Sequence, residues 1–129
     1  MERSFPGQLW AGRVLSGIAI AFLLFDAVGK LMKVAPVVEG TVKLGFSQDA
    51  VFPIGLILLM GVVLYVIPKT SILGAIYLAA YLGGAVATHF RLGNPLTTHV
   101  LFPVYVAVFL WGGLALRSPR LLTLLMAGH

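Results

Sequence analysis

Ionisable and polar side chains gather in one short stretch of an otherwise apolar chain, between Tyr81 and Pro103. His89, Arg91 and His99 lie there among amide and hydroxyl side chains. Imidazole can bind a metal or haem and can transfer protons near neutral pH, and a guanidinium offers N–H donors in a fixed fork. The same side chains can instead hydrogen-bond the backbone groups left open at helix ends. The stretch is therefore either a site or a connection between helices.

Metal chemistry is the less favoured interpretation of the two histidines. Metal sites normally show further ligands, and neither an HxxxH motif nor an acidic residue at ligand spacing accompanies His89 and His99. The chain also has no cysteine, which excludes thiolate catalysis, iron–sulfur ligation and CxxC redox chemistry by its own side chains. We therefore predict no metal, and we expect any electrons to be carried by a bound cofactor or a partner protein.

Charged residues also occur inside and just after the first apolar segment. Asp26 and Lys30 are four residues apart, with the acid first, which is the better orientation for an ion pair on one helical face. Such a pair either lies near the lipid headgroups or faces the interior of a helix bundle. Glu39 follows in the next connection. Because an acid near the membrane interface is costly without a partner, we predict that Arg91 pairs with Asp26 or Glu39.

The composition identifies the environment that these residues occupy. Of the 129 residues 60% are hydrophobic and only 10% are charged, and the mean hydropathy is +1.03. A soluble domain needs more polar surface, so we interpret the chain as one membrane domain covering residues 1–129. The formal charge of +5 does not indicate a nucleic-acid partner, because the nine Lys and Arg residues are scattered singly. They are better suited to contacts with the lipid bilayer.

Four apolar segments must position the polar residues. A crossing of about 30 Å takes about 20 helical residues, which predicts spans at about 9–32, 50–67, 72–89 and 99–116. We expect a short interfacial helix near Pro36 and an amphipathic tail after Ser118. The predicted fold is thus all-α, an integral membrane four-helix antiparallel bundle. Four crossings place both termini on one face, and a slight excess of Lys and Arg favours the cytoplasmic face.

The third span has the clearest packing pattern. Ala75, Ala79, Gly83 and Ala87 recur every four residues, and a second row of small residues runs beside them. Small residues at this spacing let helices approach closely in lipid. We therefore predict that the third span is the buried centre of the bundle and that its glycine pair serves packing.

The block GAIYLAAYLGGAVATHFRLGNPLTTHVLFP, with FDAVGKL in the first span and LGF before the second, resembles the DoxX-like family of small four-helix membrane proteins. The resemblance extends over nearly the whole chain and implies a bacterial inner-membrane protein. Better-known relatives include a subunit of thiosulfate:quinone oxidoreductase and proteins linked to sulfur and oxidative-stress metabolism. Most members have no assigned activity, so the resemblance implies a fold more firmly than a reaction.

In four antiparallel spans, the end of the first span, the connection that follows it and the connection between the third and fourth spans all lie at the same end of the bundle. The polar residues of these segments should therefore lie together. The candidate ligand-binding residues are Asp26, Lys30, Glu39, Tyr81, His89, Arg91 and His99. One hypothesis is a subunit or small enzyme of quinone-linked redox metabolism that binds a lipophilic ligand such as quinone there. The alternative is a non-enzymatic assembly, scaffold or transport-accessory protein, since no complete catalytic constellation is present. Redox partner proteins and a homo-oligomer are compatible with both.

Overall fold

The computed structural model describes residues 6–127, and these form helices and their connections with no β-strand among them. The helices are α1 (Pro6–Leu31), α2 (Ala35–Lys43), α3 (Val51–Val66), α4 (Ser71–Arg91), α5 (Phe102–Arg117) and α6 (Pro119–Ala127). Short 3-10 turns precede α3 (Gln48–Ala50) and α4 (Pro68–Thr70), and a π-helical turn (Leu96–Val100) precedes α5. The all-α prediction is confirmed, as are the short helix between the first two spans and the helical tail.

Four of these segments are long and apolar enough to cross a membrane: Gly7–Leu31, Gln48–Val66, Pro68–Arg91 and Leu96–Arg117. Their bounds lie within a few residues of those predicted. The regular part of the fourth begins at Phe102 rather than at 99, because Pro103 has no N–H to donate and so occupies the first turn of α5. The bundle is therefore the four-span membrane architecture that the sequence predicts.

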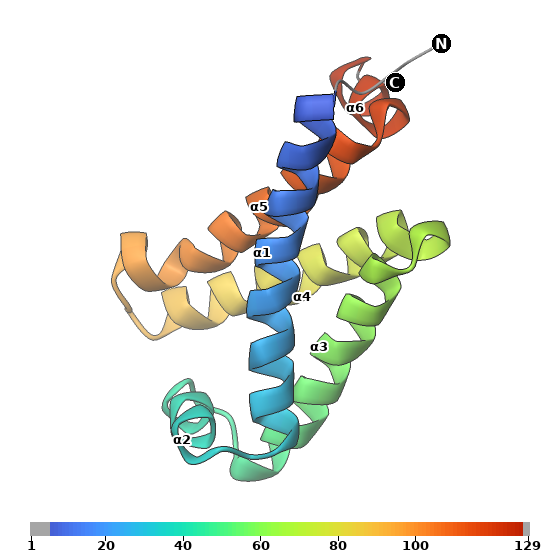
Figure 1. Cartoon of the computed structure of the whole chain (residues 1–129). Helices are drawn as coiled ribbons and strands as arrows, with labels where there is room; N and C mark the ends of the chain where they lie inside the picture. Colours follow the sequence, from blue (N-terminus) through green and yellow to red (C-terminus); the bar gives the residue numbers. More distant parts are fainter. Residues whose placement is uncertain (1–5, 128–129) are drawn as a thin grey trace.

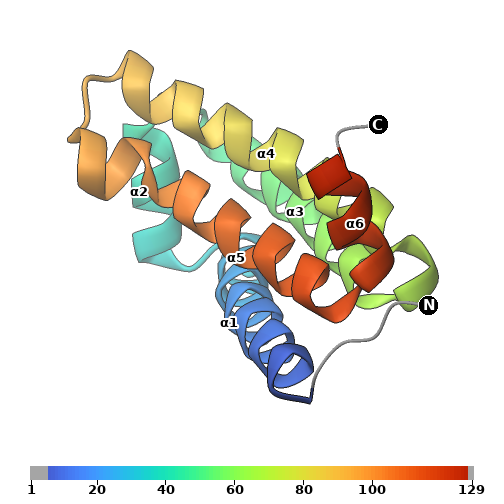
Figure 2. The ribbon, with the colours of Figure 1, turned by 90° about the horizontal axis from the view of Figure 1, so that it is seen from above.

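The four spans are arranged as two crossing pairs (Figures 1 and 2). α1 packs against α5 and α3, and α4 packs against α3 and α5. α4 and α5 run side by side and cross α1 obliquely, while α2 lies at the foot of α1, on the same side as the connection between α4 and α5. α6 turns back beside the opposite end of α5. The end that carries α2 is the end at which the predicted site residues lie.

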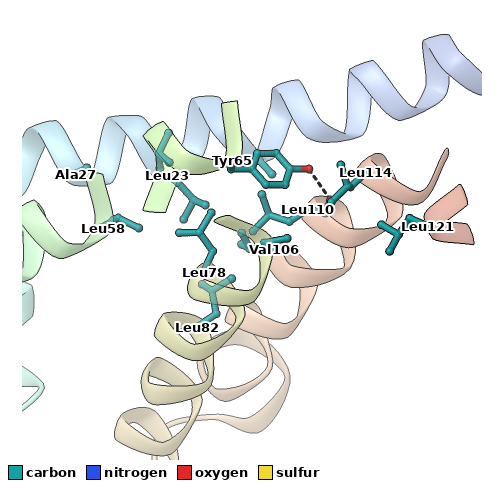
Figure 3. Close-up of a cluster of buried hydrophobic side chains, with 13 residues drawn as sticks. Leu23, Ala27, Leu58, Tyr65, Leu78, Leu82, Val106, Leu110, Leu114 and Leu121 are labelled. Atoms are coloured by element: carbon teal, nitrogen blue, oxygen red, sulfur yellow. Dashed lines mark hydrogen bonds between the residues drawn. The ribbon is translucent and has the colours of Figure 1, made fainter. Parts of the chain in front are cut away.

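The core sits where the four spans meet, and it contains one buried polar network (Figure 3). The Tyr65 hydroxyl donates to the Leu110 carbonyl at 2.5 Å, and the Ser16 hydroxyl lies 2.8 Å from the Tyr65 oxygen. The phenol has a single O–H hydrogen, and it donates this hydrogen to the carbonyl. In the other bond the Ser16 hydroxyl is therefore the donor and the Tyr65 oxygen the acceptor. Side chains and backbone of α1, α3 and α5 are thereby joined inside the buried core.

Glycines provide the closest approaches between helices. A Cβ added at Gly113 of α5 would lie 2.7 Å from the backbone nitrogen of Ser16, and one at Gly12 of α1 would lie 2.8 Å from the carbonyl oxygen of Gly113. Gly74 of α4 faces the backbone of Tyr65 in the same way, with Tyr65 Cα 2.6 Å from an added Cβ. No side chain fits at these crossings, which is how small residues hold helices together in lipid.

The prediction that the third span is the centre of the bundle is wrong for its second half. Ala75 is fully buried, but Gly83 and Gly84 have no neighbouring atom within 4 Å of an added Cβ, and Ala87 is exposed. Of the four spans, the one that contains α5 has the largest buried share, and it packs against α1, α4 and α6. The four-residue repeat identifies a smooth face of α4, but whether another helix covers that face depends on where the helices cross.

Candidate ligand-binding pocket

A pocket of about 750 Å³ lies at the α2 end of the bundle, bordered by α1, α2, α3, α4 and the beginning of α5. Its apolar lining includes Phe22, Leu23, Ile54, Ile57, Phe102 and Val106. Its polar lining consists of Asp26, Lys30, Thr41, Lys43, Tyr81, Thr88, His89, Asn94 and His99. Apolar walls with a limited number of converging polar groups are the usual composition of a small-molecule site.

Helical spacing explains why α1 contributes both kinds of side chain. Phe22, Asp26 and Lys30 follow one another every four residues, which places them on one face of α1. α4 does the same with Tyr81, Ala85 and His89. Two facing helices thus each present a stripe that runs from apolar or aromatic side chains to ionisable ones.

The ion pair predicted within the first span is confirmed. The Lys30 ammonium donates to Asp26 Oδ1, and the two side chains are 12% and 29% exposed. Lys30 also packs against α3, because a Cβ at Gly55 would lie 2.7 Å from Lys30 Cβ. Pairing lowers the cost of holding two charges near the membrane interior, so the pocket wall can carry them.

The two histidines meet at the other side of the pocket. His89 comes from the last turn of α4 and His99 from the π-helical turn, and their ring centroids are 5.8 Å apart in an edge-to-face arrangement. The Asn94 side-chain amide lies 2.8 Å from His89 Nδ1, and the Thr98 hydroxyl lies 2.8 Å from His99 Nδ1. Both rings therefore have one nitrogen engaged by a neighbour.

An aromatic pair closes the pocket wall between α1 and α5. The rings of Phe22 and Phe102 stand edge to face with centroids 5.1 Å apart. Each of the two residues is 41% exposed. A ligand in the pocket would cover part of this apolar surface, which is a favourable contribution to binding.

Arg91 lies outside this pocket, and the predicted pairing with Asp26 or Glu39 is wrong. Its Nη2 donates to the Leu44 carbonyl at 3.2 Å, above Gly45, whose φ of +98° turns the chain between α2 and α3. Asp26 already has Lys30 on its own helix, so it needs no second cation. Arg91 therefore ties the end of α4 to the α2–α3 connection.

Glu39 and Phe90 are not part of the pocket either. Glu39 is exposed on α2 and Phe90 is 69% exposed at the end of α4, and neither lines the cavity. Five of the seven predicted site residues thus meet in one pocket: Asp26, Lys30, Tyr81, His89 and His99. That these residues bind a ligand remains a prediction.

Sequence reasoning missed several lining residues, and Asn94 is the most informative of them. In the sequence alone, Asn94-Pro95 is typical of a turn. The turn is present: Gly93 has a φ of +72°, and the backbone N–H of Asn94 donates to the His89 carbonyl at 3.1 Å. The same turn returns the Asn94 side chain to the His89 ring. The signal available in the sequence was the pair Gly93-Asn94, a typical turn, which comes shortly after His89.

No three His, Asp or Glu side chains among residues 6–127 are grouped so that they could hold a metal ion. The chemistry open to the pocket is hydrogen bonding, proton transfer and coverage of an apolar ligand. Together, the fold and the pocket define a multi-pass α-helical membrane protein.

The comparison with protein families agrees with this class. A model described as the DoxX-like family matches residues 14–113, so the chain belongs to the DoxX-like family. No curated protein and no solved structure matches the chain.

Proposed function

We propose that this protein binds a lipophilic molecule with a polar head, foremost an isoprenoid quinone, as a subunit or small enzyme of quinone-linked redox metabolism in the bacterial inner membrane. The observation that carries the proposal is the pocket itself, in which apolar walls lead to Lys30, His89 and His99 at one end of the bundle.

The size and lining of the pocket suit such a ligand. A volume of about 750 Å³ falls within the roughly 300–1,000 Å³ typical of small-molecule sites. The edge-to-face pair of Phe22 and Phe102 offers aromatic surface to a flat ring. Ile54, Ile57 and Val106 offer aliphatic surface to an isoprenoid tail.

The polar groups match a quinone head. Quinone carbonyls only accept hydrogen bonds, and the Lys30 ammonium and the imidazoles can donate them. Reduction of a quinone to a quinol also takes up protons, which imidazole can transfer near neutral pH. The chain has no cysteine, so electrons would come from a redox partner rather than from a dithiol of its own.

Binding of a defined quinone tests the proposal. The protein is reconstituted into quinone-free nanodiscs and titrated calorimetrically with a benzoquinone that carries one isoprenoid unit. We expect saturable binding, and we expect Phe102→Ala and His99→Gln each to weaken it about 3- to 10-fold, because each removes a contact worth about 1 kcal/mol.

Lys69→Gln is the control, because Lys69 is exposed in the turn before α4, at the opposite end of the bundle. It should leave the affinity unchanged. Absence of saturable binding by the wild-type protein would refute the quinone proposal and favour the non-enzymatic assembly or scaffold role.

A further inference from the structure

The connection between α4 and α5 ties Asn94 to His89 twice. The Asn94 backbone nitrogen donates to the His89 carbonyl at 3.1 Å, and the Asn94 Nδ2 lies 2.8 Å from His89 Nδ1. Gly93, with its φ of +72°, makes the turn that brings the two residues together. The backbone turn therefore brings the two side chains within hydrogen-bond distance.

The chemistry of the two groups decides where the proton of His89 resides. An amide Nδ2 has two hydrogens and only donates, so the ring nitrogen that it contacts must accept. His89 Nδ1 is then bare. A neutral imidazole has one N–H, so the proton is on Nε2.

We infer that Asn94 is a positioning residue that holds His89 as its Nε2–H tautomer, so that His89 donates a hydrogen bond to a carbonyl oxygen of the ligand in the pocket. The ligand part of this inference rests on the proposed function, whereas the tautomer follows from the α4–α5 connection alone. His89 and Asn94 both line the pocket.

The neighbouring groups make this donor useful. The Lys30 ammonium is shared with Asp26, and the Thr98 hydroxyl at His99 Nδ1 can either donate or accept, so it does not fix the tautomer of His99. His89 supplies a neutral donor that costs less to desolvate than a charged one. A carbonyl-bearing head, which only accepts, is the ligand chemistry that such a donor selects.

Nitrogen-15 NMR of the ligand-free protein tests the tautomer. The full chain is labelled at its three histidines and placed in nanodiscs, and His89→Gln identifies the signals of His89. We expect a protonated nitrogen at Nε2 and a bare nitrogen at Nδ1. Asn94→Asp has nearly the same shape, but its carboxylate only accepts, so Nδ1 must then carry a proton.

A protonated Nδ1 in the wild-type protein, or an unchanged pattern in Asn94→Asp, would overturn the inference. The first result would mean that the amide oxygen, and not the nitrogen, faces the ring.

The ligand is tested with the same short-chain benzoquinone, at a pH at which the spectra show one protonated His89 nitrogen in both proteins. Asn94→Asp then has a bare Nε2, and we expect binding about 10-fold weaker, because a donor is replaced by a lone pair facing a carbonyl. Equal affinity would overturn the donor role. If the wild type shows the expected tautomer but binds no quinone, the proposed function fails while the role of Asn94 in positioning the proton stands.

Discussion

The hydroxyl of Tyr65 is a polar group in the middle of the apolar core. It joins the Ser16 hydroxyl of α1 to the Leu110 carbonyl of α5 from its own place on α3. Tyr65 is 1% exposed, so no water replaces these bonds if they are removed. Buried hydrogen bonds in membrane proteins are individually modest, and this one hydroxyl makes two.

Removal of that hydroxyl should destabilise the bundle. We expect Tyr65→Phe to lower the free energy of unfolding by about 1–2 kcal/mol, since it leaves the Ser16 hydroxyl without its acceptor. Unfolding in mixed micelles with a denaturing detergent measures the change. Tyr77→Phe is the matched control, because its hydroxyl bonds the Ile57 carbonyl on the exposed side, and it should cost under about 0.5 kcal/mol. Equal losses in the two variants would contradict the role of Tyr65.

At the scale of the elements, the crossing of α1 and α5 depends on one of two adjacent glycines. A Cβ at Gly113 would lie 2.7 Å from Ser16 N and 2.9 Å from the Gly12 carbonyl, both backbone atoms. A Cβ at Gly112 meets nothing closer than a Leu15 methyl at 3.8 Å. The two positions therefore differ in packing while sharing sequence context and residue type.

Alanine scanning of this pair separates packing from helix propensity. We expect Gly113→Ala to destabilise the bundle by about 1–3 kcal/mol, because the helices must move apart. Gly112→Ala should leave stability unchanged or raise it slightly, since alanine favours helix. Thermal unfolding in detergent compares them directly. Similar melting temperatures would show that α1 and α5 do not cross at Gly113.

Prediction from sequence succeeded for the elements and failed for some of the contacts between them. Uncharged runs and prolines located the four spans, and Pro36 located α2. The row from Ala75 to Ala87 suggested a buried face, yet an added Cβ at Gly83 meets no atom within 4 Å and Ala87 is exposed. The periodicity of a sequence shows which side chains share one face of a helix. Whether another helix packs on that face depends on where the helices cross.

For the whole molecule, the topology makes the α2 end a single membrane face. The connection between α2 and α3 and the connection between α4 and α5 both lie there, and the turn between α3 and α4 lies at the other end. Ser47, Thr97 and Lys69 are exposed representatives of these three connections.

Labelling of single cysteines tests this arrangement, because the chain has none of its own. In sealed vesicles, Ser47→Cys and Thr97→Cys should react alike with a membrane-impermeant thiol reagent, and Lys69→Cys should show the opposite accessibility. Permeabilised vesicles, in which all three should react, provide the control. Labelling of Ser47→Cys and Thr97→Cys from opposite sides would refute the four-span topology.

The sequence alone determined that this protein lies in a membrane, that it crosses four times, and that Asp26 pairs with Lys30. These properties follow from local hydropathy and from spacing along one helix. Both depend only on residues that are close together in the chain. The tertiary structure decided that the span containing α5, rather than α4, is the most buried, that Arg91 bonds a backbone carbonyl outside the pocket, and that the Asn94 side chain lies against the His89 ring. Those contacts join residues whose distance depends on how helices cross and how a connection turns, and no local pattern specifies either.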